Sequence, residues 1–241
     1  MALQRLVERE FLDELSPLDP RAIGSRRDLC RINAWMMQAK LMARLLASYG
    51  KGQPRTILDL GSGDGTFMLK VARRLSPIWR DVTVQLLDTR DLVTAETRKD
   101  FSELGWTAKP LCSDVFEALP RGDLGVVDAI TANLFLHHFD HTQLHVLLAG
   151  MAQKTSFIAA CEPRRSAFAL TGSRMLFAIG CNDVSRHDAV VSVKAGFRGK
   201  ELSETWCAAD LSEKAWRLEE RPAGLFTHTF VARRIGTGVC E

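Results

Sequence analysis

The sequence lacks most of the features that mark a specialised class of protein. Its six cysteines are widely spaced and form no Cys-x-x-Cys pair, which argues against a zinc ribbon or a dithiol redox site. No stretch approaches the ~18 uninterrupted apolar residues of a membrane-spanning helix, and the first fourteen residues have no apolar centre like that of a signal peptide. We therefore expect a cytoplasmic protein with reduced thiols and no membrane span.

The sequence also has very little tyrosine and no large surplus of charge of one sign. The 32 basic residues are nearly balanced by 29 acidic ones, so a protein built to bind nucleic acid or another polyanion is not expected. Tyr49 is the only tyrosine, and histidine or carboxylate groups must therefore supply any acid–base chemistry near neutral pH. With 241 residues, 46% of them hydrophobic, the chain is long enough for one large domain with a small cap.

The first fifty residues predict a helical preamble. Apolar residues recur at helical spacing over residues 3–15. Ser25 and Asp28 have the spacing of a capping box, which would begin a second helix at the serine. The apolar residues within 29–46 lie on one face of that helix. We interpret residues 1–54 as an N-terminal helical cap, which could serve as a lid.

From residue 55 onward, strand patterns and helix patterns alternate. The predicted strands cover residues 56–60, 82–88, 108–112, 126–132 and 157–161, and the helices between and after them cover 66–75, 94–104, 143–152 and 166–179. Such alternation is typical of parallel βαβ units in a doubly wound sheet. Two closing strands, 216–220 and 226–232, predict an antiparallel hairpin at its edge. We therefore predict an α/β fold with a mostly parallel, seven-stranded sheet, formed by one domain over residues 55–241.

A glycine loop at the end of the first strand carries the clearest chemical signal. Gly61, Gly63 and Gly65 follow that strand, and Asp59 lies two residues before the first of them. Glycines between a strand and a helix let the backbone approach a ligand, and the helix N-terminus attracts an anionic group. Asp88 closes the second strand, where an open α/β sheet positions a carboxylate for ribose hydroxyls. The alternatives are that the glycines only form a tight turn and that Asp88 only caps a helix.

These residues resemble the motifs of class I S-adenosylmethionine-dependent methyltransferases. The family's first motif is an acid followed by Gly-x-Gly-x-Gly, its second strand ends in an acid, and a further acid follows its third strand; the resemblance covers roughly residues 55–162. It implies a Rossmann-like methyltransferase fold and S-adenosylmethionine as cofactor, with S-adenosylhomocysteine as product. The cofactor-binding residues it implies are Asp59, Gly61, Ser62, Gly63, Gly65, Asp88, Thr89, Asp114, Val115 and Asn133.

A second resemblance concerns the acceptor. Residues 186–198 resemble an insertion of bacterial small-molecule methyltransferases that are often encoded with polyketide or quinone pathways, and we expect an insertion at about 180–202 to contribute to the pocket. The signatures of amine and pyrimidine C5 methyltransferases are absent. The expected reaction is O- or C-methylation of a small, phenolic, polyketide- or quinone-like natural product. An RNA or protein methyltransferase, or a non-catalytic subunit with this fold, are the alternatives.

A phenolic acceptor needs a base near neutral pH, and histidine is the available residue type. His187, beside Asp188, is the first candidate, and His137 and His138 are the others. Residues expected to bind the substrate are Arg27, Asn33, Met36, Phe135, Glu162 and Arg186. His141 and His145 have the i, i+4 spacing of a zinc pair, but no third ligand is implied and Asp140 has the position of a helix N-cap. We therefore expect no metal.

Overall fold

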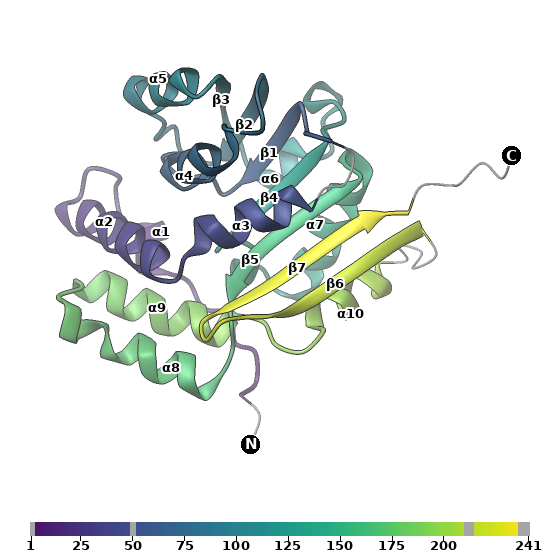
Figure 1. The fold of residues 1–241 in the computed structure, drawn as a ribbon. Coiled ribbons are helices and arrows are strands. Elements are labelled where there is room, and N and C mark those ends of the chain that lie inside the picture. Colours follow the sequence, from purple (N-terminus) through teal and green to yellow (C-terminus); the bar gives the residue numbers. More distant parts are fainter. Residues whose placement is uncertain (1–2, 49–51, 210–214, 236–241) are drawn as a thin grey trace, which may run out of the picture.

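The computed structural model describes residues 3–48, 52–209 and 215–235, and its centre is a seven-stranded sheet with helices on both faces (Figure 1). The strands in chain order are β1 (Thr56–Leu60), β2 (Val82–Asp88), β3 (Trp106–Cys112), β4 (Ala129–Asn133), β5 (Phe157–Pro163), β6 (Trp216–Ala223) and β7 (Thr227–Arg234). Their order in the sheet is β3-β2-β1-β4-β5-β7-β6. Strands β1 to β5 are parallel, whereas β7 runs antiparallel to β5 and β6. The predicted fold class is confirmed.

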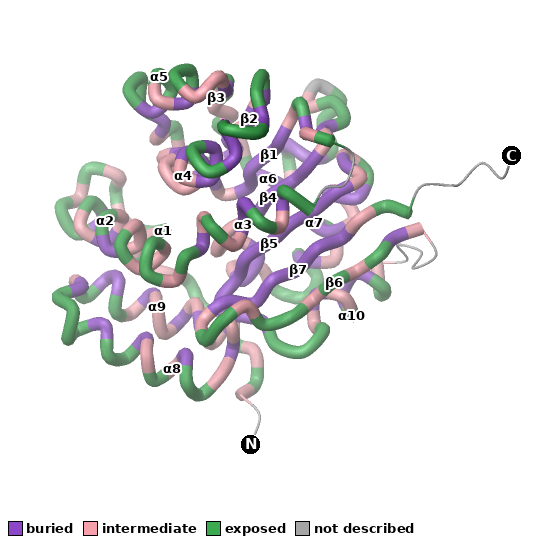
Figure 2. Tube along the Cα trace, in the orientation of Figure 1, coloured by how far each residue is buried: buried purple, intermediate pink, exposed green. Residues whose placement is uncertain are grey.

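Two hydrophobic layers hold the helices against the sheet. One face is covered by α3 (Gln38–Ala47), α4 (Thr66–Leu75) and α5 (Ala95–Glu103), and the other by α6 (Val115–Ala118), α7 (His141–Lys154) and α10 (Glu201–Ala208). The central strands are buried from both sides (Figure 2), as parallel strands between two helical layers must be. This burial gives the loops at the carboxyl ends of the strands a rigid base.

The first segment differs from the helix predicted over residues 3–15. Only α1 (Phe11–Glu14) is helical. The preceding residues run extended because Leu6 donates its backbone N–H to Lys194 and the guanidinium of Arg5 donates to the carbonyls of Ala195, His137 and Phe139. Tertiary hydrogen bonds therefore override the local helical pattern, and we refer to residues 3–12 as the N-terminal strap.

The second helix also begins earlier than predicted. Helix α2 (Pro20–Trp35) starts at Asp19, whose side chain accepts a hydrogen bond from the N–H of Arg21, with a proline at the first helical position. The predicted capping box at Ser25 is therefore wrong: Ser25 and Asp28 lie inside the helix and bind Ser185.

The predicted single helix over residues 29–46 is also wrong, because the chain breaks between α2 and α3. Met37 there adopts a left-handed conformation with φ of 54°, which a continuing α-helix excludes. The two helices on either side of Met37 are α2, which ends at Trp35, and α3. This break lets the preamble fold back against the sheet.

The segment between β5 and β6 forms a helical layer beside α2. It contains α8 (Ala167–Arg174), the 3-10 helix η3 (Met175–Ile179) and α9 (Asp183–Ala195), and α9 lies between α2 and α8 (Figure 1). Two further 3-10 helices are η1 (Gly122–Leu124) and η2 (Leu136–His138). Among the described residues, no helix combines the length and apolar character needed to cross a bilayer.

Candidate active site

A cavity of about 520 Å³ opens at the carboxyl ends of the parallel strands. It lies where β1 and β4 are neighbours and the chain order of the sheet reverses, the position at which open α/β sheets bind ligands. Its walls come from the glycine loop, from the loops after β2, β3 and β4, from α2 and from the N-terminal strap. The cavity therefore joins the predicted cofactor motif to the preamble.

The glycine loop has a conformation that only glycine tolerates well. Gly61, Gly63 and Gly65 all have positive φ angles, of 65°, 56° and 77°. A Cβ atom at position 61 would collide with the ring of Phe135. The carboxylate of Asp88 accepts a hydrogen bond from the N–H of Gly63 at 2.9 Å, and this bond ties the loop to the end of β2. Gly61 and Gly63 line the cavity, whereas Gly65 is the N-cap of α4.

Asp59 lies beneath the loop and is buried. Burial raises its pKa to about 7, and the nearby charge of Asp88 adds to this effect, although the hydroxyl of Thr131 donates a hydrogen bond to it at 2.6 Å and opposes the rise. The carboxyl group is therefore poised to ionise when a cation enters the cavity. Asp59 and Asp88 both line that cavity.

Several polar atoms at the cavity are buried yet have no hydrogen-bond partner among the described residues. They are Oδ1 of Asn33, Oγ of Ser62 and Oδ1 of Asn133. Buried polar atoms are normally paired, so these three fit a polar ligand at the site. Together with the glycine loop and the acids, they match what the amino acid and nucleoside parts of S-adenosylmethionine would require. The remaining predicted cofactor residues Thr89, Asp114 and Val115 also line the cavity.

Glu162 organises the loop that follows β4. It is fully buried, and its carboxylate accepts hydrogen bonds from the backbone N–H groups of Phe135, Leu136 and His137. It also contacts Nδ1 of His137 at 2.9 Å. Leu134, which precedes these residues, has a strained φ of 53°. Sequence reasoning expected Glu162 to contact the substrate, but the structure has it behind the cavity wall.

His137 lies between two carboxylates. Its Nδ1 atom faces Glu162, and its Nε2 atom is 3.3 Å from Oε1 of Glu10. Burial alone would lower the pKa of His137, but the hydrogen bonds and charges of Glu10 and Glu162 outweigh burial and raise the pKa to about 9. Burial would raise the pKa of Glu10, but the hydrogen bond from His137 and the charges of both histidines bring it to about 2. His137 is therefore an imidazolium at neutral pH.

His138 is the more accessible member of this cluster. Its Nε2 atom is 3.7 Å from Glu10 and its Nδ1 atom is 3.5 Å from Asp13. The hydroxyl of Ser192 donates to Glu10. Glu10, Asp13, His137, His138 and Ser192 all line the cavity. Sequence reasoning missed Glu10, Asp13 and Ser192. The helical pattern of residues 3–15 gives no sign that Glu10 and Asp13 enter the site, and Ser192 lies on α9 in no recognisable motif.

His187, the first sequence-based candidate for the base, does not line the cavity. Its ring stacks on Phe11 with centroids 3.7 Å apart and an interplanar angle of 5°. Its Nδ1 atom is 3.0 Å from Asp188, whose carboxylate also accepts from the N–H groups of Phe11 and Leu12. The pair thus holds the strap against α9, and this packing is what keeps the imidazole out of the cavity.

Of the other residues predicted to bind the substrate, some line the cavity and some do not. Asn33 and Phe135 line the cavity, whereas Arg27, Met36 and Arg186 do not. Arg27 is exposed on α2, whereas the cavity is lined by Leu29 and Asn33 of the same helix. Arg186 is tied to Asp183 on the surface of α9 at 2.9 Å.

The predicted N-cap at Asp140 is confirmed, since Asp140 and Gln143 form a capping box at the start of α7. Of the two histidines considered as a zinc pair, His141 is exposed, and Nε2 of His145 lies 2.7 Å from the carbonyl of Ala208. This pair therefore begins α7 at the surface of the molecule, away from the cavity lining.

The comparisons with known proteins agree with this geometry. Residues 57–155 match a family model described as a methyltransferase domain. The plantazolicin methyltransferase BpumL in complex with S-adenosylhomocysteine is similar in structure, with 12% identity, a TM-score of 0.64 and coverage of 90% of this chain and 92% of that one. The pyocyanin biosynthetic protein PhzM has 19% identity, a TM-score of 0.61 and coverage of 94% and 62%.

An O-methyltransferase family protein from Burkholderia thailandensis has 17% identity, a TM-score of 0.56 and coverage of 91% of this chain and 64% of that one. No curated protein sequence matches the chain. At such low identities, the structural likeness establishes the fold.

Residues 57–155 therefore match a methyltransferase domain, within a fold that the chain shares with solved methyltransferases. The glycine loop, its acids and the buried polar atoms at the cavity fit S-adenosylmethionine, the cofactor that the family resemblance implies.

Proposed function

We propose that the protein methylates a small, apolar acceptor with an ionisable hydroxyl group, of phenolic, polyketide or quinone type, by O- or C-methylation. One observation carries this proposal: a single cavity joins the cofactor motif, apolar walls and the Glu10–His137–His138 cluster. The apolar side chains that line it include Leu12, Leu29, Phe135 and Phe139. Such a mixture of apolar walls and a few polar groups is typical of small-molecule sites.

In this proposal the predicted cofactor residues keep the roles that the family resemblance implies. Gly61 and Gly63 pass beneath the methionine part of the cofactor, and Asp59 orients the ammonium group of that part through the loop. Asp88 binds the ribose hydroxyls through oxygen lone pairs that its bonds to the loop leave available. Asp114 and Val115 flank the adenine. Ser62, Thr89 and Asn133 complete the contacts, while Gly65 allows the turn into α4.

The acceptor would lie between the carboxyl ends of the parallel strands and the helical preamble over residues 1–54. We propose that residues 1–54 and the insertion at about 180–202 cover it as a cap, separate in role from the methyltransferase domain over 55–241. This assignment is supported by α2, which contributes Leu29 and Asn33 to the cavity, and by the strap and α9, which contribute Glu10 and Ser192. A closed cap would exclude water from the reacting groups.

His138 is the residue that we assign to proton removal. S-adenosylmethionine supplies an already activated methyl group, so the chain must orient the acceptor oxygen and accept its proton. His137 cannot serve as a base while it is an imidazolium whose two ring nitrogens face Glu162 and Glu10; it fixes these carboxylates at the cavity wall. His138 reaches the same cavity and is partly exposed, and the carboxylate oxygens of Asp13 and Glu10 are 3.5 and 3.7 Å from its ring nitrogens, so neither nitrogen is held as closely as Nδ1 of His137 and one can accept a proton.

The test is a panel of phenols, quinones and pyrones incubated with the protein and S-adenosylmethionine, with methylated product detected by mass spectrometry. His138→Ala should abolish most of the turnover found, and calorimetry should give unchanged cofactor affinity. His187→Ala is the matched control and should retain turnover. If His187→Ala loses turnover and His138→Ala does not, the general base would be His187 on α9. Cofactor binding without product from any acceptor would favour a non-catalytic subunit.

A further inference from the structure

The outer surface of the layer formed by α2, α8 and η3 combines exposed apolar side chains with cationic ones. Trp35, Phe168, Met175, Phe177 and Ile179 are each more than half exposed, although residues of these types are usually buried. In Figure 2 the outward sides of these helices are coloured as exposed or intermediate, in contrast to the buried strands of the sheet. Large exposed apolar patches mark interaction sites.

Contacts connect several parts of this surface, and we refer to its exposed apolar side chains as the strip. Phe168 and Met175 are seven residues apart, about two turns of α8, and the guanidinium of Arg31 on α2 donates to the carbonyl of Ile179 in η3. The ring of Phe226, from the β6–β7 turn, lies 5.6 Å from Phe168 and 5.1 Å from Trp35. The hairpin therefore connects α8 to the end of α2.

Charge on this surface is predominantly positive, although Arg21, Arg31 and Arg186 are each paired with an aspartate of the same segments. Residues 16–40 and 163–194 contain six exposed cationic residues but a single exposed acid, Asp183. The six are Arg21, Arg27, Arg31, Lys40, Arg174 and Arg186. In these two segments arginine and lysine outnumber aspartate by ten to four, although two of the ten, Arg165 and Lys194, pair with Glu201 and Glu8 outside the segments. The surplus of six compares with three in the whole chain. The remainder of the chain is thus net negative.

The two kinds of side chain alternate on α2. Ile23, Arg27, Arg31 and Trp35 follow one another at intervals of four residues and are all exposed, so they form one stripe of the helix. Arg186 lies over the ring of Phe177, with its guanidinium carbon 6.0 Å from the ring centroid. An apolar strip bordered by arginines matches the interface of an anionic bilayer, where rings enter the headgroup region and cations meet phosphates.

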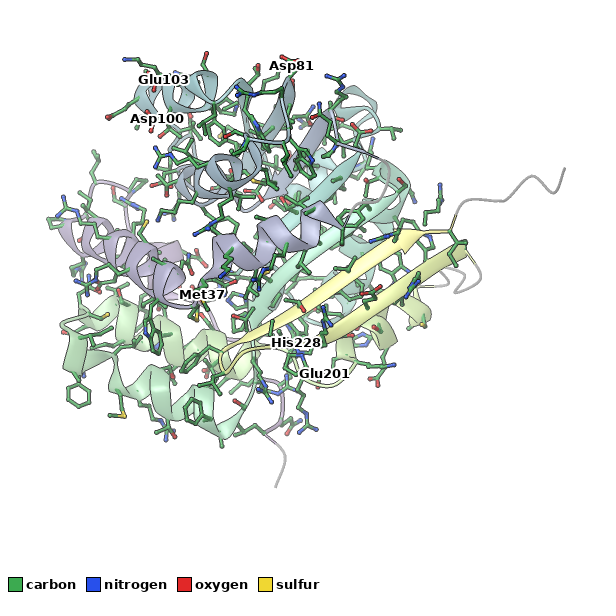
Figure 3. All side chains as sticks on the ribbon, viewed as in Figure 1. Met37, Asp81, Asp100, Glu103, Glu201 and His228 are labelled. Carbon is green, nitrogen blue, oxygen red and sulfur yellow. The ribbon has the colours of Figure 1, made fainter. Side chains whose placement is uncertain are left out.

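One end of the strip, at Trp35, lies close to a second cavity. This cavity, of about 290 Å³, is lined by Met37, Phe67 and the cationic Lys40 and Lys70, and it shares Asn33, Phe67 and Lys70 with the wall of the main cavity. Met37, labelled in Figure 3, lies at the junction of α2 and α3, two residues after Trp35. An apolar molecule at Trp35 would therefore be close to the second cavity, which shares part of its wall with the main one.

We propose that this surface, formed by Trp35, Phe168, Met175, Phe177, Ile179 and the surrounding arginines, docks the protein on an anionic lipid bilayer. Docking positions the second cavity at the membrane surface, where an apolar acceptor dissolved in lipid can enter. Docking itself is carried by surface residues outside the main cavity, and only the entry of an apolar acceptor from the bilayer rests on the proposed function.

Trp35 makes the test specific. It is 69% exposed, whereas the other four tryptophans, Trp79, Trp106, Trp206 and Trp216, are at most 5% exposed. Vesicles of phosphatidylglycerol and phosphatidylcholine that carry brominated acyl chains should quench the fluorescence of the wild-type protein at low ionic strength. Quenching should disappear in Trp35→Phe, should fall as salt rises, and should be weak with pure phosphatidylcholine.

A triple variant retains this reporter and changes the rest of the surface. Phe168→Ser/Ile179→Ser/Arg174→Glu should weaken vesicle binding, measured by flotation, by at least about tenfold. Its matched control is Ile78→Ser/Val146→Ser/Arg98→Glu, which makes the same kinds of change at exposed positions elsewhere and should bind like the wild type. Circular dichroism and calorimetry with S-adenosylmethionine check that both variants fold.

Three results would overturn the proposal. They are an absence of binding to anionic vesicles by the folded wild-type protein, equal binding to neutral vesicles, and equal binding by the two triple variants. Light scattering adds a fourth: a wild-type dimer that the surface variant converts to a monomer, with no vesicle binding, would assign this surface to a second copy of the chain. In each case retained cofactor binding would leave the proposed methyl transfer unaffected.

Discussion

The carboxylate of Glu162 lies 2.9 Å from Nδ1 of His137 and also accepts three backbone N–H groups from the loop that precedes α7. One buried side chain thereby fixes both the path of this loop and the orientation of an imidazole at the cavity. The other nitrogen of that imidazole faces Glu10 on the N-terminal strap. The geometry of the acceptor end of the site thus depends on a residue behind its wall.

Glu162→Gln should therefore disturb acceptor turnover more than cofactor binding. The amide can accept with one oxygen only, and its NH₂ group would face N–H donors, so we expect a loss of roughly 1–3 kcal/mol in stability. Denaturant titration measures this loss, and kcat/KM with the best acceptor measures the effect on the site.

Glu220→Gln is a matched control for this substitution. Glu220 is similarly buried, accepts from the N–H groups of Leu202 and Ser203, and faces His228 at 2.8 Å, far from the cavity lining. Comparable destabilisation with unchanged turnover is expected. Equal effects of the two variants on kcat/KM would mean that Glu162 acts only through stability.

The pKa shift of His137 predicts how the stability of the cofactor-free protein depends on pH. A folded pKa of about 9, above the ordinary 6.5, means that the imidazolium stabilises the fold fully below pH 6.5 and that this contribution is lost as pH rises through about 9. Glu10→Gln removes one of the two carboxylates and should move this loss to lower pH. Thermal unfolding from pH 6 to 10 measures the shift.

Glu8→Gln is the control for this comparison. Glu8 lies two residues earlier on the strap, is exposed, and pairs with Lys194 at 3.4 Å, where screening by solvent makes an ion pair worth little. Its pH profile should follow that of the wild type. A Glu10→Gln profile identical to the wild-type profile would contradict the assignment of His137 as an imidazolium.

Asp88→Ala should weaken cofactor binding for two reasons. The substitution removes a charged acceptor proposed for the ribose, and it also frees the N–H groups of Gly63 and Arg90 that the carboxylate now binds. We expect a loss of about 1.5–3 kcal/mol per charged hydrogen bond, measured by calorimetry with S-adenosylhomocysteine. The exposed neighbour Asp91 provides the control, since Asp91→Ala should leave affinity unchanged. Wild-type affinity in Asp88→Ala would refute the ribose assignment.

Most of the sheet and the cofactor end of the site could be predicted because their signals are local. The apolar run of β1, Asp59 before it ends and the glycines after it lie within ten residues of sequence. Each positive φ angle in the loop restricts its position to glycine. Because Asp59 and the glycines are close in sequence at the end of β1, the strand itself positions them at the carboxyl edge of the sheet. Their place in the site can therefore be predicted without knowledge of distant contacts.

The acceptor end could not be predicted because it depends on distant contacts. Glu10 reaches His137 across 127 positions of sequence, and Arg5 holds the strap by binding carbonyls more than 130 residues away. The helical pattern of the strap gives no sign of these bonds, which replace the helix. For His187, the adjacent acid correctly indicated a contact with Asp188, but the stacking on Phe11 that holds the ring outside the cavity lining is a tertiary contact.

The proposed mechanism assigns proton removal to His138 and uses no metal, although Glu10, His137 and His138 offer ligand atoms within 4.8 Å of one another. Dialysis against EDTA should therefore leave turnover unchanged, and added Zn²⁺ should not increase it. Turnover that is lost with EDTA and restored by one divalent cation, together with one equivalent of that metal by elemental analysis, would refute the prediction. EDTA dialysis and metal analysis of His145→Ala, a substitution on α7 outside the cavity, check whether a metal ion binds adventitiously at the surface.

Proton release should accompany cofactor binding, because the pKa of Asp59 is raised to about 7 by burial in the cavity that the cationic cofactor enters. The positive charge of the ligand favours the ionised carboxylate, so affinity should rise with pH up to about 7 and then become constant. Calorimetry at pH 6 in two buffers with different ionisation enthalpies should detect up to one proton released, and at pH 8.5 none. Asp59→Asn should abolish the difference between buffers. If the wild-type protein exchanges no proton at pH 6, Asp59 either remains protonated in the complex or is already ionised before the cofactor arrives.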